Sequence, residues 1–454
     1  MTLAPFTKTS VDRASELTLN ATRTESIQIV APSAETLTVG QVYHFTSRAE
    51  ALAVVGTDYS SGNYAPLIIE ELYKVQDKWD IYYACPGKNT ESVTTTTSTN
   101  AIVPGDTKIT LTSATGFSVG NYINFGSGAT QEYRKILALS GSDVTVNALS
   151  FSHAIGEDVV KVTAFDVANL ATCRTALASK PGRLYIEDSY GSTQTSALKT
   201  YLNARESNEL FTHAVVGYPF GTSQATAKSE ATAINSKRIS QVYGLVELQD
   251  KGIVCDGVMT AVKLIAQLGA KKASQRVRNS AVVSMNSIAI TNCSDVVSND
   301  TSSTMSKTEL TALVNSNVSC LFNQTVDTVN AIRVYKMVTT YNLDESSLPS
   351  TTYSNIVDIL AEDFMREDII IKYDNFAGRL AIEGNDLTDK DGDLVKVQAF
   401  CQGVIDSYSF LDEEAYNPTV AVARVSTGSI QVTIAYQTVV SADQVSFVFA
   451  KQVR

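Results

Sequence analysis

The order of hydrophobic and polar residues predicts alternating strands and helices over much of this chain. Strict alternation of apolar and polar residues is typical of a half-buried strand, and apolar residues three and four positions apart are typical of a helix. By these patterns the stretch before Gly87 contains strands at Ser26–Val30, Val42–Phe45 and Trp79–Ala84 and helices at Ser47–Val55 and Pro66–Gln76. Ser47, followed three residues later by Glu50, has the capping-box spacing of a helix N-terminus. This stretch therefore indicates part of an α/β domain.

The same alternation of strand and helix returns between Phe165 and Gly269. The predicted strands are Arg183–Glu187, His213–Gly217 and Ile239–Glu247, and the predicted helices are Thr193–Glu206, Gln224–Lys237 and Val258–Leu268. Strands that alternate with helices form βαβ units, so this order predicts a partly parallel sheet covered by helices. A further helix at Met305–Asn315 and strands at Val318–Phe322 and Ala331–Thr339 continue the domain.

A purely β pattern from Ile102 to Val162 separates these two α/β stretches. Short strand-like runs recur there at roughly ten-residue spacing, with glycine and serine turns between them. The threonine-rich run Val93–Thr99 is expected to be a low-complexity, β-prone linker that leads into them. We expect a small all-β sandwich or barrel that is inserted into the α/β domain, faces outward and is dispensable for assembly.

The C-terminal part of the chain predicts an amphipathic helix followed by strands. Apolar residues at helical spacing indicate a helix over Tyr353–Asp368, and Leu394–Val404 fits a helix, a strand or a mixture. Ser429–Tyr436 and Gln444–Phe449 have the alternation and the β-branched and aromatic residues of strands. Because an unpaired strand edge invites another chain, these strands either form a hairpin within one domain or pair with a neighbouring molecule.

Together these patterns predict an α/β and α+β multidomain fold. It has a partly parallel sheet with covering helices, an inserted small all-β domain, and a C-terminal α+β domain that ends in strands. The expected boundaries are 1–25 for an extended N-terminal arm, 26–92 and 164–340 for the α/β domain, 93–163 for the insertion and 341–454 for the C-terminal domain.

Composition narrows the possible partners. The formal net charge is −11, so no global positive field attracts nucleic acid or anionic membranes. No signal peptide and no membrane-spanning apolar run is recognised, which predicts synthesis in the cytosol without membrane anchoring. Only 18% of the residues are charged, a low fraction that favours a surface with much interface.

Motifs for catalysis or cofactor binding are weak. The three histidines, His44, His153 and His213, have no Cys, Asp or Glu at ligand spacing, and no phosphate-binding glycine loop opens a helix. The acidic turn Asp389–Asp393 resembles part of a calcium loop, but Leu387 and Gln398 occupy two of the ligand positions. We therefore expect no catalytic residues, no cofactor and no metal. The alternative is an α/β enzyme with a β-domain lid, whose site would lie near Glu187, Asp188 or Tyr218.

The order of segments resembles the contractile tail sheath proteins of phages and related contractile injection systems. Ser47–Gly56 is similar to the family's helix that runs to a glycine after the first strand. Thr308–Asn315 with Val318–Leu321, and Ile332–Thr340, are similar to later helix and strand segments of the family. Gly428–Ile434 followed by Val445–Phe449 is similar to its closing strands.

This resemblance implies a structural subunit rather than an enzyme. Such a subunit polymerises as stacked, hexameric rings around an inner tube and contracts by rigid-body rearrangement to drive the tube through a target envelope. The implied partners are further copies in a helical homo-oligomer, the inner tail tube protein, and baseplate and tail terminator proteins. The implied location is a virion tail or injection-system particle assembled in the host cytoplasm. Another phage structural or adhesive protein, such as a baseplate component, is the alternative.

The resemblance also implies which residues make the contacts. N- and C-terminal arms add strands to the sheets of neighbouring subunits, so that main-chain hydrogen bonds join the lattice. The residues expected in these added strands are Ile27, Ile29, Ile430, Val432, Ile434, Val445, Phe447 and Phe449. The residues expected on a helix that faces the tube are Asp363, Arg366 and Glu367.

Overall fold

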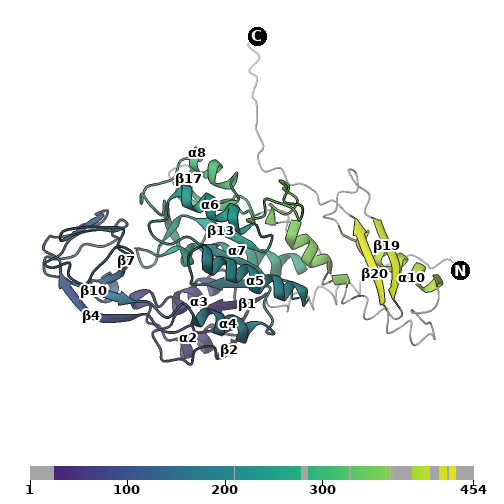
Figure 1. The fold of residues 1–454 in the computed structure, drawn as a ribbon, viewed down its shortest axis with the longest axis horizontal. Coiled ribbons are helices and arrows are strands. Elements are labelled where there is room, and N and C mark those ends of the chain that lie inside the picture. Colours follow the sequence, from purple (N-terminus) through teal and green to yellow (C-terminus); the bar gives the residue numbers. More distant parts are fainter. Residues whose placement is uncertain are drawn as a thin grey trace, which may run out of the picture. The chain divides into compact units, whose positions relative to one another are not determined.

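The computed structural model of this 454-residue chain is divided into two compact units. The described residues are 25–208, 210–277, 285–326, 329–356, 358–366, 368–369, 372, 391–408, 419–426 and 429–435. The larger unit spans Thr24–Lys271 and Ser287–Ile356, and the described residues from 358 onward belong to the smaller unit (Figure 1). Each unit is considered by itself below.

A mixed eight-stranded sheet forms the core of the larger unit (Figure 1). Its strands are β1 (Glu25–Val30), β2 (Val42–Phe45), β3 (Trp79–Ala84), β11 (Leu184–Glu187), β12 (His213–Gly217), β13 (Ile239–Tyr243), β17 (Val318–Val326) and β18 (Val329–Lys336). They follow the order β18-β17-β13-β12-β11-β1-β3-β2. The six inner strands are mutually parallel, and β18 and β2 pair antiparallel at the two borders. The predicted α/β fold with a partly parallel sheet is confirmed.

Helices cover this sheet and leave its inner strands buried. The helices are α2 (Arg48–Val55), α3 (Ala65–Tyr73), α4 (Asn169–Leu177), α5 (Ser192–Ser207), α6 (Gln224–Ile234), α7 (Gly257–Val277) and α8 (Lys307–Val314). Leu177, Leu202 and Ile234, from α4, α5 and α6, share one apolar cluster with Tyr185 and Val216 of the sheet. Strands buried on both faces are expected for a parallel sheet, and β1, β11, β12 and β13 are buried at every position.

Serine side chains cap the N-termini of α2 and α8, among other helices. Ser47 Oγ accepts from the Glu50 N–H at 3.3 Å, and the Glu50 carboxylate accepts from the Thr46 N–H at 3.2 Å. The Glu50 carboxylate therefore bonds to Thr46, the residue before the cap, and not to the main chain of the cap residue Ser47. Ser306 and Glu309 form a complete capping box at the start of α8. These bonds satisfy N–H groups that have no partner inside a helix.

The predicted strand Ile239–Glu247 is two strands in the structure. Gly244, with φ of +118°, lies between β13 and β14 (Leu245–Leu248). A side chain is rarely tolerated at such an angle, so the glycine lets the chain turn out of the large sheet. β14 then joins β15 (Ile253–Val254) and β16 (Cys293–Val297) in a separate three-stranded sheet.

Residues 90–163 form two small antiparallel sheets with their own apolar core. The strands are β4 (Thr90–Thr97), β5 (Lys108–Thr110), β6 (Tyr122–Phe125), β7 (Glu132–Lys135), β8 (Ala138–Ser140), β9 (Asp143–Thr145) and β10 (Asp158–Thr163). Ile109, Ile123 and Val144 are fully buried in that core. The run Val93–Thr99 was predicted to be a linker, and this is wrong for Val93–Thr97, which lies in β4 and pairs with β10. Threonine is β-branched, so a threonine-rich run suits a strand.

The smaller unit packs helices against a β-hairpin. Its elements are α10 (Asp391–Ile405), β19 (Thr419–Ser426) and β20 (Ser429–Ala435), and residues 358–366 are helical. Leu394–Val404, which fitted more than one kind of element in the sequence, is helical. Met365, Cys401 and Val420 meet in the apolar core of this unit.

Two glycines at the end of β12 and the start of α7 allow their backbones to touch. A Cβ atom at Gly217 would lie 1.8 Å from the Gly257 carbonyl oxygen, and one at Gly257 would lie 1.9 Å from the Tyr218 carbonyl oxygen. We expect Gly217→Ala to lower the free energy of unfolding by about 3 kcal/mol or more, because main-chain atoms would have to shift. Denaturant unfolding measures this change.

Gly403→Ala is the matched control for that variant, since a Cβ at Gly403 in α10 meets no atom within 4 Å. It should leave stability unchanged or raise it by up to about 1 kcal/mol, as alanine is the better helix former. Equal stability of Gly217→Ala and the wild type would show that the close approach of β12 and α7 is not required.

Candidate functional site

The hairpin β19–β20 contains three of the residues predicted for strand addition, Ile430, Val432 and Ile434. The two strands pair antiparallel from Thr419 opposite Ala435 to Ser426 opposite Ser429. Val422, Val432 and Ile434 pack against the apolar core of the smaller unit, next to α10. Of the two arrangements considered for Ser429–Tyr436, a hairpin within the domain is therefore present, and its described partner strand is β19. Gln444–Phe449 lies outside the described residues.

The hydrogen bonds of Val420 show which main-chain groups of the hairpin point outward. Gln398 Nε2 donates to the Val420 carbonyl at 2.8 Å, and Gln402 Oε1 accepts from the Val420 N–H at 3.0 Å. Both main-chain groups of Val420 are thus directed to α10 rather than to β20. Val420 and Ile434 form a non-hydrogen-bonded pair of the ladder, in which such pairs alternate with hydrogen-bonded ones.

This alternation defines the outer edge of β20. Val432 opposes Val422, two positions from the pair of Ile434 and Val420, and Ile430 opposes Arg424, four positions from it. The N–H and C=O groups of Ile430, Val432 and Ile434 therefore point away from β19. Within the described residues the hairpin is a two-stranded sheet, so no third strand pairs with these groups there.

The other residues predicted for strand addition have different positions. Ile27 and Ile29 lie in β1, which pairs with β11 on one side and β3 on the other, and both side chains are fully buried. β1 has no free edge, so the prediction that Ile27 and Ile29 add to a neighbouring subunit is wrong. Val445, Phe447 and Phe449 lie outside the described residues.

The predicted tube-facing helix is only partly suited to that role. Asp363 is buried, with 4% of its surface exposed, so the prediction that it faces a tube is wrong. The Arg366 side chain is 46% exposed and forms an ion pair with Glu362 one turn earlier. Glu367 lies outside the described residues. Arg366 is therefore the one residue of this set whose described side chain is available for contact.

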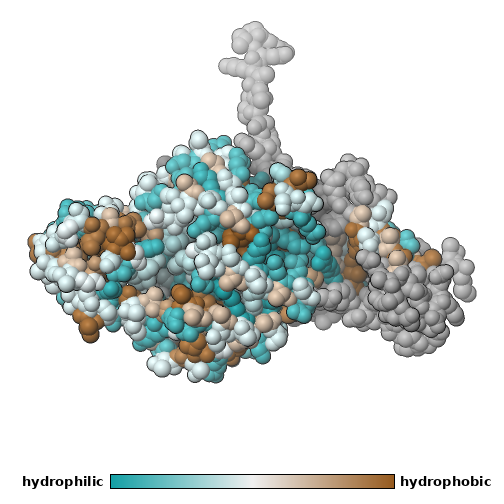
Figure 2. Space-filling view, in the orientation of Figure 1, coloured by the Kyte–Doolittle hydropathy of each residue, from teal (hydrophilic) through white to brown (hydrophobic). Residues whose placement is uncertain are grey.

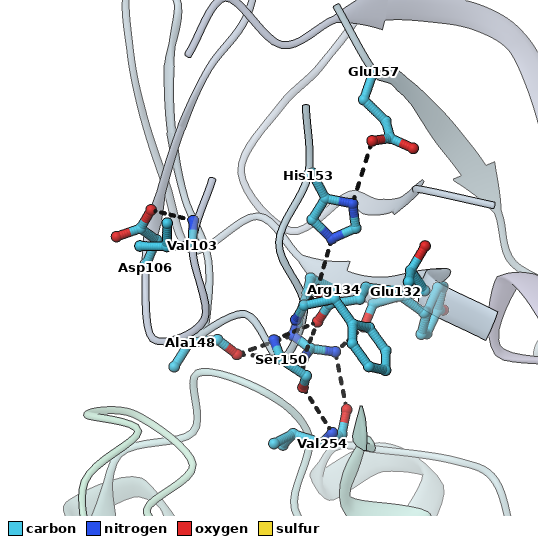
Figure 3. A network of polar contacts seen from close by, with 12 residues as sticks. Val103, Asp106, Glu132, Arg134, Ala148, Ser150, His153, Glu157 and Val254 are labelled. Atoms are coloured by element: carbon cyan, nitrogen blue, oxygen red, sulfur yellow. Dashed lines mark hydrogen bonds and ion pairs between the residues drawn. The ribbon is translucent and has the colours of Figure 1, made fainter. Parts of the chain in front are cut away.

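The inserted β-domain is tied to the α/β domain by a buried polar network (Figure 3). Arg134 of β7 donates to Glu132 at 2.6 Å, to Ser150 Oγ at 3.0 Å and to the Val254 carbonyl at 2.9 Å. His153 Nε2 lies 2.9 Å from the same Glu132 carboxylate. Burial alone would raise the pKa of Glu132, but Arg134, His153 and two main-chain N–H groups outweigh it and lower that pKa.

Aromatic contacts strengthen the same junction. Tyr133 of the insertion stacks on Tyr122 with ring centroids 4.7 Å apart and meets Tyr64 edge-on, while the Arg134 guanidinium lies 5.3 Å from the Phe220 ring centroid. Removing the insertion would expose this apolar surface and leave buried polar groups without partners. The structure therefore argues against the expectation that the insertion is dispensable.

The outer surface of the insertion carries exposed apolar side chains. Figure 2 shows brown patches over this domain, and Val93, Val103, Val119 and Ile155 are each more than half exposed. Exposed apolar surface of this kind is common at contact sites.

The residues considered for an enzyme site are buried and engaged in structural contacts. Glu187 accepts from Arg174 Nε at 2.8 Å and from the Tyr185 hydroxyl at 2.6 Å. The Tyr218 hydroxyl donates to the Ala227 carbonyl at 2.8 Å. Asp188 is 7% exposed, and burial, followed by the neighbouring Asp256, raises its pKa to about 7. The structure brings these side chains to the same end of the sheet but leaves none of them open to a substrate.

The histidines occupy three unrelated environments. His44 is exposed and pairs with Asp80, His213 is buried with its Nε2 3.0 Å from Ser240 Oγ, and His153 belongs to the junction network. Within the described ranges no three His, Cys, Asp or Glu side chains are grouped so that they could hold a metal ion. A search of the same residues finds no helix with the length and apolarity of a membrane span.

Comparisons with known proteins find similarity in structure rather than in sequence. No family model matches the sequence, and no curated protein does. The sheath tail protein of Desulfitobacterium hafniense superposes with a TM-score of 0.51 at 9% identity, over 97% of this chain and 100% of that one. The sheath tail protein Lin1278 of Listeria innocua gives 0.52 at 11% identity, over 94% and 99% of the two chains.

Assembled particles give similar matches. A chain of the contracted helical sheath of the anti-feeding prophage (AFP) superposes with a TM-score of 0.53 at 11% identity, over 100% of this chain and 97% of that one. A chain of the AFP baseplate gives 0.54 at 11% identity, over 95% and 93% of the two chains. These neighbours are sheath tail proteins or chains of sheath and baseplate assemblies. This chain has their fold along almost its whole length, as the resemblance in sequence predicted.

The raised pKa of Asp188 generates a prediction about stability and pH. An aspartate with an ordinary pKa of 3.8 in the unfolded chain and about 7 in the folded one makes stability fall as the pH rises between these values. Asp188→Asn removes this dependence. We expect the variant to be more stable than the wild type by on the order of 2–4 kcal/mol at pH 8 and nearly equal to it at pH 4. Denaturant unfolding at both pH values gives the two differences, and equal differences at both would contradict the assignment.

Proposed function

We propose that this protein is the structural subunit of a contractile tail sheath. The observation that supports this most is the superposition of almost the entire chain on sheath proteins, including the contracted AFP sheath. A hairpin with an outward-facing strand edge is the feature that such a subunit needs to join a lattice. No catalytic step belongs to this function, since the stroke draws on free energy stored when the sheath assembles.

In this proposal, the outer edge of β20 receives a strand from a neighbouring subunit. The main-chain groups of Ile430, Val432 and Ile434 supply the hydrogen bonds, and the alternation of side chains sets the register. The arriving strands come from the N-terminal arm and from the C-terminal residues Val445, Phe447 and Phe449. Each subunit both gives and receives, so the contact is head-to-tail and generates a helical sleeve.

The remaining parts of the assembly follow from that lattice. The subunits form stacked hexameric rings around an inner tube, and baseplate and terminator proteins bind at the two ends of the sleeve. Arg366 is the residue assigned to contact with the tube. Contraction is a rigid-body change between two packings, during which the added strands keep the subunits connected. The sleeve belongs to a phage tail or injection-system particle assembled in the host cytoplasm and drives the tube through an envelope.

A baseplate component is the second candidate, because the chain also superposes on a chain of the AFP baseplate. The exposed apolar side chains of the insertion would then be a binding surface. Microscopy separates the two functions, since a sheath subunit forms long sleeves and a baseplate component forms discrete particles.

Deletion of the proposed arms tests the assembly. We expect the purified full-length chain to form hollow sleeves in negative-stain electron microscopy, and chains that lack residues 1–23 or 444–454 to stay soluble and folded without forming them. The reason is that each deletion removes a strand that neighbouring subunits would receive. Normal sleeves from either shortened chain would contradict strand addition by the arms.

A proline substitution tests the receiving edge. The Val432 N–H points away from β19, so Val432→Pro removes no hydrogen bond within the hairpin, and proline is tolerated on strand edges. It should nevertheless prevent sleeve formation, because an arriving strand loses a donor and meets the proline ring. Val432→Ala is the control, since it loses the same apolar contacts but keeps the N–H. Sleeves from the proline variant equal in number and length to those of the alanine variant would place the docking edge elsewhere.

A further inference from the structure

We propose that Gln398 and Gln402 of α10 block the outer edge of β19 at Val420 and thereby restrict strand addition to the edge of β20. This inference rests on the proposed function and assigns to two residues a role in its specificity. An isolated two-stranded hairpin has two free edges, and nothing in the strand pattern of β19 itself distinguishes its edge from that of β20.

The two glutamines give Val420 the hydrogen bonds that an added strand would give it. A neighbouring strand pairs with an edge residue by accepting from its N–H and donating to its carbonyl oxygen. Gln402 Oε1 accepts from the Val420 N–H at 3.0 Å, and Gln398 Nε2 donates to the Val420 carbonyl at 2.8 Å. A strand arriving at this edge would have to displace both amides and would gain no hydrogen bond at Val420 in exchange.

The spacing of the two glutamines on the helix makes this double contact possible. They are four positions apart in α10, so their side chains lie on the same face of the helix, one turn from each other. Asp406 Oδ1 accepts from Gln402 Nε2 at 2.7 Å. That bond engages the amide nitrogen and leaves the amide oxygen directed at the strand. Helix and strand also share the apolar core, where Val397 and Cys401 meet Val420.

The consequence is a hairpin with one receiving side. Natural proteins protect sheet edges because a free edge templates the pairing of other chains. A hairpin with two receiving sides would let one subunit accept strands in two directions, which produces branched or lateral polymers instead of one sleeve. With the β19 edge closed, a first arm adds to β20 and a second arm adds to the first on the same side. The glutamines therefore act as specificity residues for assembly.

The experiment uses the full chain in the Val432→Pro background, in which the β20 edge is blocked. We expect this variant to be monomeric by analytical ultracentrifugation. Adding Gln398→Ala and Gln402→Ala should restore association through the opened β19 edge, giving irregular polymers in place of sleeves. Val395→Ala in the same background is the matched control, because Val395 is an exposed side chain of the same helix, and it should stay monomeric. Circular dichroism should show the same helix and strand content in all variants.

Amide hydrogen exchange measures the hydrogen bond between the Val420 N–H and Gln402. In the Val432→Pro background the amide of Val420 should be protected, and loss of the two glutamines should make it exchange faster by on the order of tenfold or more, as expected for a lost hydrogen bond. The peptide that contains Val420, followed by mass spectrometry, gives this rate.

The outcomes separate this inference from the proposed function. Restored association together with faster exchange at Val420 supports the closing role. A glutamine variant that remains monomeric, or one that associates with unchanged exchange at Val420, overturns it. Sleeves formed by Val432→Pro alone would instead contradict the docking edge of the proposed function.

Discussion

Each strand at the border of a β-sheet has main-chain N–H and C=O groups that need partners. The borders in this protein differ in which residues, if any, cover these groups. At β18 the border is covered by the segment from Ser287 to Ile290, whose N–H groups donate to the Val334 and Ile332 carbonyls at 2.7 and 2.8 Å. At β19 the side chains of Gln398 and Gln402 bond both main-chain groups of Val420. At β20 no described residue covers the border, and the same exposed groups that would be a hazard in a monomer are what a lattice contact requires.

The larger unit is held together by close packing and buried polar contacts. The large sheet is buried on both faces by helices, and β12 approaches α7 so closely that glycine is needed on both sides of the contact. The insertion is held by a charge network in which Arg134 and Glu132 are almost completely buried. Separating such a pair would leave a buried charge unpaired, at a cost on the order of 3–5 kcal/mol.

The sequence was informative about the positions of helices and strands, and less informative about which elements lie beside each other. Alternation located the strand at Ile430–Ile434 and the strand at Ile27–Ile29 equally well, because both have the period of a half-buried strand. The alternation did not indicate that one strand lies in the middle of a sheet and the other at a border. The helix over Leu394–Val404 was ambiguous since its apolar residues are nearly continuous. Gln398 and Gln402 were not recognised as functional. Their one available signal, two amides four positions apart on the same helix, has meaning only when a strand edge lies beside them.

What the sequence determined by itself is local: the period of each element, the serine caps, the turns around glycine, and an order of segments similar to that of sheath proteins. Those features depend on residues close together in the chain. Which strands have neighbours on both sides was decided only by the tertiary structure, since pairing joins residues far apart in sequence. It placed Ile27 and Ile29 in the middle of a sheet and Ile430, Val432 and Ile434 at a border. The same local pattern therefore became core in one place and candidate interface in the other.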